Sequence, residues 1–85
     1  MKLEERVLKF VNRIRAKQKL KPLKKLPRGI PLDTDACPIA RAVGGIANAR
    51  TVEWCDGTAR VSTPFFVREF MYQFDTGQIP ELVAK

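Results

Sequence analysis

A run with three prolines and a glycine, residues 20–31, constrains the fold of this chain most. A helical pattern precedes this run, and a pattern of both helices and strands follows it. The run reads Leu-Lys-Pro-Leu-Lys-Lys-Leu-Pro-Arg-Gly-Ile-Pro, and three prolines in twelve residues exclude both a regular helix and a central strand. We therefore predict an extended arm over residues 21–32. Leu20, Leu23 and Leu26 repeat with the three-residue period of polyproline II, which would align them along one edge against the domain. A flexible tether is the alternative.

Residues 1–20 carry the pattern of a basic amphipathic helix, from about residue 2 to about residue 20. Apolar side chains recur at spacings of three and four, and cations occupy another side of the helix. The apolar stripe consists of Leu3, Val7, Phe10, Val11 and Ile14. Acidic residues in the first turn and lysines in the last complement the helix dipole. Pro22 is expected to end the helix.

A short helix is expected to begin at Pro38, because proline suits the first position of a helix. Either Asp35 or Cys37 would cap it. Gly44 and Gly45 supply the end of the helix.

Two β-prone runs within residues 51–62 flank Asp56-Gly57, the pair favoured in two-residue type I′ hairpin turns. The turn fixes the register of the hairpin. The predicted opposing pairs are Cys55–Thr58, Trp54–Ala59, Glu53–Arg60 and Val52–Val61. Since side chains alternate along a strand, Val52 and Trp54 would face the core and Cys55 would face the other way.

Residues 62–64, Ser-Thr-Pro, predict the start of a final helix with a hydroxyl at its cap and proline just inside it. Its buried stripe is expected to contain Phe66, Val67, Phe70, Met71 and Phe74. Gly77 would end the helix, and residues 79–83 would fold back over the core. Phe65 and Tyr72 fall off the stripe on a shared flank.

These elements predict one small α+β domain of 85 residues. It comprises a basic helix (1–20), a proline-rich basic arm (21–32) and an α+β core (33–85), with helices covering one face of the hairpin.

The positive charge is concentrated in the first third of the chain. Residues 1–28 hold eleven basic and two acidic residues, a net charge of +9, whereas residues 29–85 hold five basic and seven acidic residues, a net charge of −2. Clustered cations release counterions from a phosphate backbone, and no base-reading motif accompanies them. We therefore predict a non-enzymatic protein that binds a polyanion, above all nucleic acid, without strong sequence specificity. The predicted contacts are Arg13, Arg15, Lys17, Lys19, Lys21, Lys24, Lys25 and Arg28.

Other interpretations of these features stay open at this point. The basic helix could lie on an anionic membrane surface, although its apolar stripe is narrow and lacks tryptophan. The cations could also form a solvated face and nothing more. In the main alternative, Phe65 and Tyr72 anchor a protein partner, such as a host protein bound by a small phage effector. A homodimer through Leu3, Val7 and Ile14 would need a core that does not accept them.

Several chemistries are excluded by residue content. Histidine is absent and the two cysteines lie far apart in the sequence, so neither a zinc site nor a Cys–His nucleophile can be assembled within one chain. Gly44-Gly45 fits no phosphate-binding loop. We predict no catalytic residue, metal or cofactor. No apolar run spans a bilayer or resembles a signal peptide, so a cytoplasmic location is expected, that of the host if the chain is phage-encoded.

The cysteines leave two questions open. Cys37 is either a buried packing residue or a thiol activated at a helix start. Cys55 is either an accessible thiol or the partner of Cys37 in a disulfide.

Three segments resemble small uncharacterised proteins of actinobacteria and their phages. They are Leu26-Pro-Arg-Gly-Ile-Pro, Cys37-Pro-Ile-Ala-Arg-Ala-Val and Phe70-Met-Tyr-Gln-Phe-Asp-Thr-Gly-Gln-Ile-Pro-Glu-Leu-Val. The resemblance covers about half of the chain and carries no known activity. It implies a phage or accessory protein that binds macromolecules rather than an enzyme.

Overall fold

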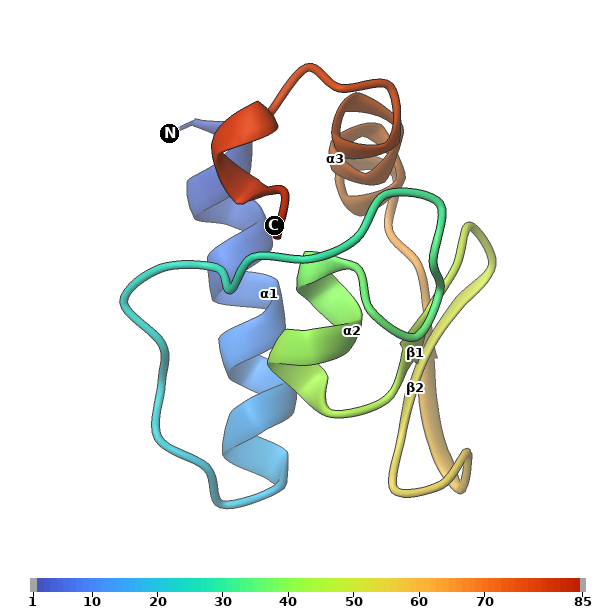
Figure 1. Ribbon diagram of the computed structural model, residues 1–85. Coiled ribbons are helices and arrows are strands. Elements are labelled where there is room, and N and C mark those ends of the chain that lie inside the picture. Colours follow the sequence, from blue (N-terminus) through green and yellow to red (C-terminus); the bar gives the residue numbers. More distant parts are fainter. Residues whose placement is uncertain (1, 85) are drawn as a thin grey trace.

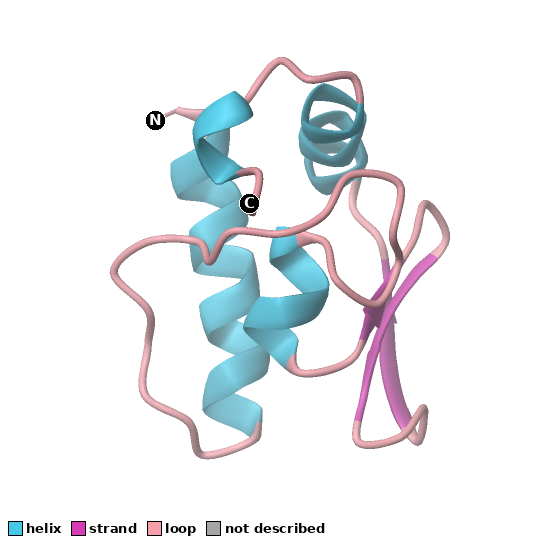
Figure 2. Ribbon diagram, in the orientation of Figure 1, coloured by secondary structure: helices cyan, strands magenta, loops and turns pink. Residues whose placement is uncertain are grey.

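The computed structural model, which describes residues 2–84, shows three α-helices packed beside a three-stranded antiparallel sheet (Figures 1 and 2). The helices are α1 (Leu3–Lys17), α2 (Pro38–Val43) and α3 (Phe65–Asp75), followed by a 3-10 turn, η1 (Pro80–Leu82). The strands are β1 (Ile46–Ala47), β2 (Thr51–Trp54) and β3 (Ala59–Ser62), in the order β1-β2-β3. This arrangement confirms the predicted α+β class.

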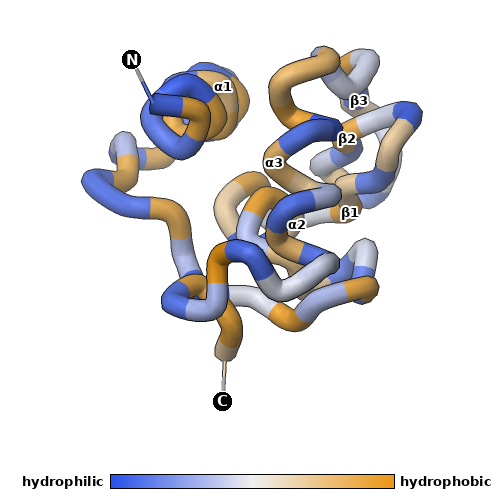
Figure 3. Tube along the Cα trace, turned by 90° about the horizontal axis from the view of Figure 1, so that it is seen from above, coloured by the Kyte–Doolittle hydropathy of each residue, from blue (hydrophilic) through white to orange (hydrophobic). Residues whose placement is uncertain are grey.

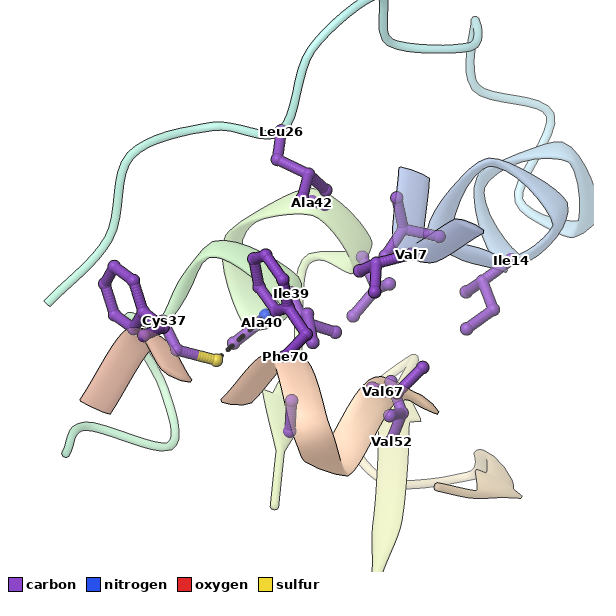
Figure 4. Packing of buried hydrophobic residues seen from close by; sticks show 14 of the residues in the cluster. Val7, Ile14, Leu26, Cys37, Ile39, Ala40, Ala42, Val52, Val67 and Phe70 are labelled. Carbon is purple, nitrogen blue, oxygen red and sulfur yellow. Dashed lines mark hydrogen bonds between the residues drawn. The ribbon is translucent and has the colours of Figure 1, made fainter. Parts of the chain in front are cut away.

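The hydrophobic core joins α1 to the rest of the chain. Val7, Val11 and Ile14 are buried in one cluster with residues of α2, β2 and α3. Figure 4 shows Val7 in the same apolar cluster as Ile39 and Phe70. Because the core accepts Val7 and Ile14, they are not available for a dimer seam, and the interpretation of this stripe as a homodimer contact is wrong.

Helix α1 ends earlier than was expected from the position of Pro22. Its last helical residue is Lys17, and Lys19 adopts a left-handed conformation with φ 60°. The N–H of Lys19 then donates to the carbonyl of Ala16 (3.0 Å), and the N–H of Leu20 donates to the carbonyl of Arg15 (2.9 Å). This is the hydrogen-bond pattern of a Schellman motif, which reverses the chain before Pro22 is reached.

Replacing Lys19 by glycine should stabilise the protein by about 0.5–1 kcal/mol, because a left-handed φ strains a residue with a Cβ atom. Urea unfolding of Lys19→Gly and wild type would measure the change. Lys21→Gly removes the same charge from an exposed arm residue without a positive φ, and we expect it to be no more stable than wild type. Equal effects of both substitutions would contradict the conformational explanation.

The arm is held along α1 rather than tethered loosely. The side chain of Asn12 pairs with both backbone groups of Leu23: Nδ2 donates to the carbonyl (3.0 Å), and Oδ1 accepts from the N–H (2.8 Å). Leu26 is buried at 5% exposure and Leu23 is half-buried, but Leu20 is 44% exposed. The expectation that all three leucines line one edge is therefore wrong for Leu20, which lies in the reversal after α1.

The far end of the arm pairs with the last residues of the chain. The N–H of Gly29 donates to the carbonyl of Leu82 (2.8 Å), and the Gly29 carbonyl accepts from the N–H of Ala84 (2.8 Å). A Cβ atom at Gly29 would come within 2.5 Å of the Ala36 carbonyl oxygen. Only glycine fits this close approach. Residues 79–83 thus fold back over the core as predicted, with Leu82 buried.

The hairpin register is confirmed for three of the four predicted pairs, while Cys55 and Thr58 lie outside the strands and do not form a strand pair. Glu53 pairs with Arg60 and Trp54 with Ala59, and Asp56 and Gly57 take the positive φ values, 54° and 83°, that a type I′ turn requires. Cys55 also has a positive φ, 56°, so it leaves the extended conformation before the turn proper. Strand β1 was not predicted, because two residues are too short to show an alternating pattern.

The start of α3 differs from its prediction by one residue. Pro64 is the residue before the helix, with ψ 156°, and no side chain caps the helix. The Thr63 side chain is buried, and its hydroxyl donates to the carbonyl of Asn48 (2.8 Å). The hydroxyl that was expected to cap α3 instead ties the loop between β1 and β2 to the strand end.

Candidate polyanion-binding face

The exposed side of α1 is cationic. At about 100° per residue, Lys9 and Arg13 lie roughly opposite the buried Val7 and Val11. The exposed cations are Arg6, Lys9, Arg13 and Lys17 on α1, and Lys2 directly before the helix. Lys2, Arg6 and Lys9 were not among the predicted contacts, although the helical wheel places them on the same side.

The arm adds its cations next to this side of α1. It returns beside the helix, and Figure 3 shows hydrophilic stretches of α1 and of the arm at the same side of the molecule. Ten of the eleven Lys and Arg residues in 2–28 are exposed. We call these ten the basic face: Lys2, Arg6, Lys9, Arg13, Lys17, Lys19, Lys21, Lys24, Lys25 and Arg28.

Arg15 is the eleventh cation, and its guanidinium is engaged inside the protein. Nε donates to the carbonyl of Lys21 (2.9 Å), and Nη1 donates to the carbonyl of Ala42 (2.9 Å). The carbonyl of Ala42 belongs to the last turn of α2, where a cation also complements the helix dipole. Arg15 therefore joins α1, the arm and α2, and we leave it out of the contact set that the sequence predicted.

Arg15→Ala should lower the free energy of unfolding by about 1–3 kcal/mol, since it leaves two carbonyls without a charged donor. The matched control is Arg13→Ala, which removes the same side chain type from the exposed side of the same helix. Urea unfolding should show little change for Arg13→Ala. A similar loss in both variants would contradict the bridging role of Arg15.

Charge is unevenly distributed over the basic face. Three carboxylates, Glu4, Glu5 and Glu81, line the same groove as Lys24, Lys25 and Arg28. Opposite charges are therefore balanced at that end of the arm. The sequence contains no acidic residue anywhere from Arg13 to Arg28, but the cations from Arg13 to Lys21 are not among the residues that line this groove. We call the exposed cations of this stretch the basic end: Arg13, Lys17, Lys19 and Lys21.

Two cations of α1 lie over aromatic rings. The guanidinium of Arg6 is 4.5 Å from the ring centroid of Phe66, and the ammonium of Lys17 is 6.0 Å from that of Trp54. Both side chains stay exposed. Their charges are thus positioned by the fold and still accessible to a partner.

The alternative anchors are also exposed. Phe65 and Tyr72 have 73% and 66% of their surface accessible. Beside Tyr72 lies an apolar groove of about 330 Å³, also lined by Leu32, Cys37 and Met71. Leu32 is 82% exposed at φ 62°, and its N–H donates to Asp75 Oδ1 (2.9 Å). Sequence reasoning missed Leu32, because Pro-Leu-Asp reads as an ordinary turn.

Both cysteines are free, which answers the disulfide question. Cys37 is buried and caps α2: its Sγ accepts from the N–H of Ala40 at 3.4 Å (Figure 4). Burial raises the pKa of the Cys37 thiol, and this effect outweighs the lowering by the backbone N–H groups of Ala40 and Ile39. Cys37 is therefore a capping and packing residue, while Cys55 is exposed.

The raised pKa predicts a pH-dependent contribution to stability. Above the ordinary thiol pKa of about 8.5, the unfolded chain loses the Cys37 proton before the folded chain does, so stability falls as pH rises. The stability difference between wild type and Cys37→Ser should be constant at lower pH and shift against wild type above about pH 8.5. Urea unfolding across this range would measure it. Cys55→Ser is the control, and an unchanging difference for Cys37→Ser would refute the prediction.

Residues 2–84 contain no group of three or more Cys, Asp or Glu side chains arranged to hold a metal ion. Over the same residues, no helix is both long and apolar enough to cross a bilayer. Comparison of the chain with protein-family models, curated proteins and solved structures finds no match. The resemblance to small actinobacterial and phage proteins stays a prediction.

Proposed function

We propose that this protein is a non-enzymatic nucleic-acid-binding protein that contacts phosphate groups through its basic face, centred on the basic end. The observation that carries the proposal is the exposure of ten cations on α1 and the adjacent arm. Eleven cations in residues 1–28 outnumber two acidic residues. Among the contacts within residues 2–84, Arg15 is the one of these cations whose side chain donates hydrogen bonds to carbonyls.

The shape of the basic face favours backbone contacts over base reading. One side of α1 is buried in the core, and the arm lies along another, so α1 does not protrude as a recognition helix does. Phe10, the single aromatic residue in 1–28, packs edge-on against Phe66 at 6.2 Å between centroids. It offers no stacking platform for bases. Binding should therefore depend on phosphate charge and be nearly independent of sequence.

The test is a salt titration of binding to a generic DNA duplex and a generic RNA. Each phosphate neutralised contributes about 0.9 to the slope of log affinity against log salt. The variant Arg13→Gln/Lys19→Gln/Lys21→Gln removes three cations of the basic end, so its slope should be lower by about 3. Fluorescence anisotropy at several salt concentrations would measure the slopes.

The matched control is Lys24→Gln/Lys25→Gln/Arg28→Gln, which changes the net charge equally. Its slope should fall less, because Glu4, Glu5 and Glu81 already balance these cations. Equal losses in the two variants would show that only net charge matters and overturn the location of the site. Absence of binding at low salt would overturn the proposal itself. Binding of a host protein through Phe65 and Tyr72, the other hypothesis from the sequence, stays a prediction.

A further inference from the structure

Four exposed cations of α1 lie in one line along the helix. They follow one another at intervals of three or four residues, and at about 100° per residue they fall within about 80° of the helix circumference. At about 1.5 Å per residue, neighbouring cations are about 4.5–6 Å apart along the helix axis, and the whole line is about 16 Å long. We call these four the cation row: Arg6, Lys9, Arg13 and Lys17.

The cation row is bordered on both of its long sides. On one side, the side chain of Asn12 hydrogen-bonds to the backbone of Leu23 in the arm. On the other side, Phe10 packs edge-on against Phe66 of α3. A ligand that contacts all four cations at once therefore has to run parallel to α1.

The charge of the row is uniform. From Arg6 to Lys17 the sequence contains no acidic residue. The two carboxylates of α1, Glu4 and Glu5, line the groove on the side of the arm. The row thus offers a series of like charges at a regular spacing.

This spacing is close to that of the phosphates on one nucleic-acid strand. Neighbouring phosphates advance about 3.4 Å along the axis of a duplex and also turn about it, so that they are about 6–7 Å apart in space. The long side chains of lysine and arginine can take up the small difference. One phosphate can therefore meet each cation in turn, provided that the strand stays beside α1 over three steps.

A strand within a duplex turns away from a straight row. Over three steps it turns through about 100° around the duplex axis, since one turn takes about 10 bp. The surface of a helix is convex as well, so the strand lies closest to Lys9 and Arg13, in the middle of the row, and recedes from both ends.

The cations at the two ends of the row are poorly placed to follow a receding strand. The guanidinium of Arg6 lies 4.5 Å from the ring centroid of Phe66, and the ammonium of Lys17 lies 6.0 Å from that of Trp54. Each would have to leave its ring to reach further out. A single strand, which has no fixed axis, can instead follow the row to both ends.

We propose that the ligand of the basic face is single-stranded nucleic acid, which lies extended along α1 with one phosphate beside each cation of the row. This inference rests on the proposed function and names the class of its ligand. Counterion release per phosphate favours the duplex, because each contact contributes about 0.9 to the salt slope there and about 0.7 on a single strand. The preference for a single strand therefore comes from the shape of the row and not from charge density.

Two ligands with equal numbers of phosphates test the preference: an oligothymidylate, which stays unpaired, and a mixed-sequence duplex of half its length. At about 0.15 M salt, the single strand should bind about five- to tenfold more tightly, because four contacts of about 0.7 outweigh two of about 0.9. Fluorescence anisotropy would measure both affinities. A duplex that binds equally or more tightly overturns this inference and leaves the proposed function intact, whereas absence of binding to either ligand overturns both.

Two double variants test how the strand lies. Arg6→Gln/Lys17→Gln removes the end cations, and the matched control Lys9→Gln/Arg13→Gln removes the middle ones, with the same change in net charge. On the single strand, each variant should lower the salt slope by about 1.4. On the duplex, the middle variant should lower it by about 1.8 and the end variant by much less.

Glutamine keeps the side-chain stem of Arg6 and Lys17 over the aromatic rings, so the end variant should fold like wild type, which circular dichroism would check. Equal losses from the end and middle variants on the duplex would show that a duplex strand reaches the whole row, and would overturn the inference. An unchanged slope for the end variant on the single strand would overturn it too, because the strand would not extend along the row.

Discussion

Two polar side chains of α1, Asn12 and Arg15, hold the arm against the helix, and the position of the arm's cations depends on them. A proline-rich segment cannot satisfy its own backbone polar groups, so other parts of the protein must. Asn12 supplies both a donor and an acceptor to Leu23, and Arg15 donates to Lys21. Without these contacts, a run of like charges would repel itself and extend into solvent. The fold thus brings together charges that would otherwise separate.

The exposed sides of α1 and α3 have different physical properties. On α1, one side is apolar and buried and the other is cationic. Its exposed surface therefore suits a partner that is attracted by long-range electrostatic forces, which salt weakens. On α3, the exposed side is aromatic with one charge of each sign at its centre. It therefore suits a partner whose binding depends on close contact and complementary shape. The properties of both exposed sides follow from which side chains are not buried in the core. The core contains, or has packed against it, the apolar side chains of the predicted helical stripes, and Phe65, which lies off its stripe, stays exposed.

The features that were predictable from the sequence are those decided within a few residues. The hairpin register follows from Asp56-Gly57, and the limits of α2 follow from Cys37, Pro38 and Gly44, because turns and caps are local. The role of Arg15 was not predictable, since its acceptor Ala42 lies 27 residues away in the sequence. The groove that Glu4, Glu5 and Glu81 share with cations of the arm was not predictable either, because these residues also lie far apart in the sequence. In the candidate site, the exposure of the cations was anticipated, but which of them share a groove with carboxylates depends on how distant segments meet.

The parallel bridge between Gly29 and Val83 has a consequence for how this protein is made. The arm's far end pairs with a segment much further along the sequence, so its docking cannot finish until that segment has left the ribosome. Contacts between such distant residues form late and slow folding. The core cluster contains Leu26 and Leu82 from the same two segments, so it also closes late. During synthesis, the cationic stretch is therefore made before the segment that fixes its far end.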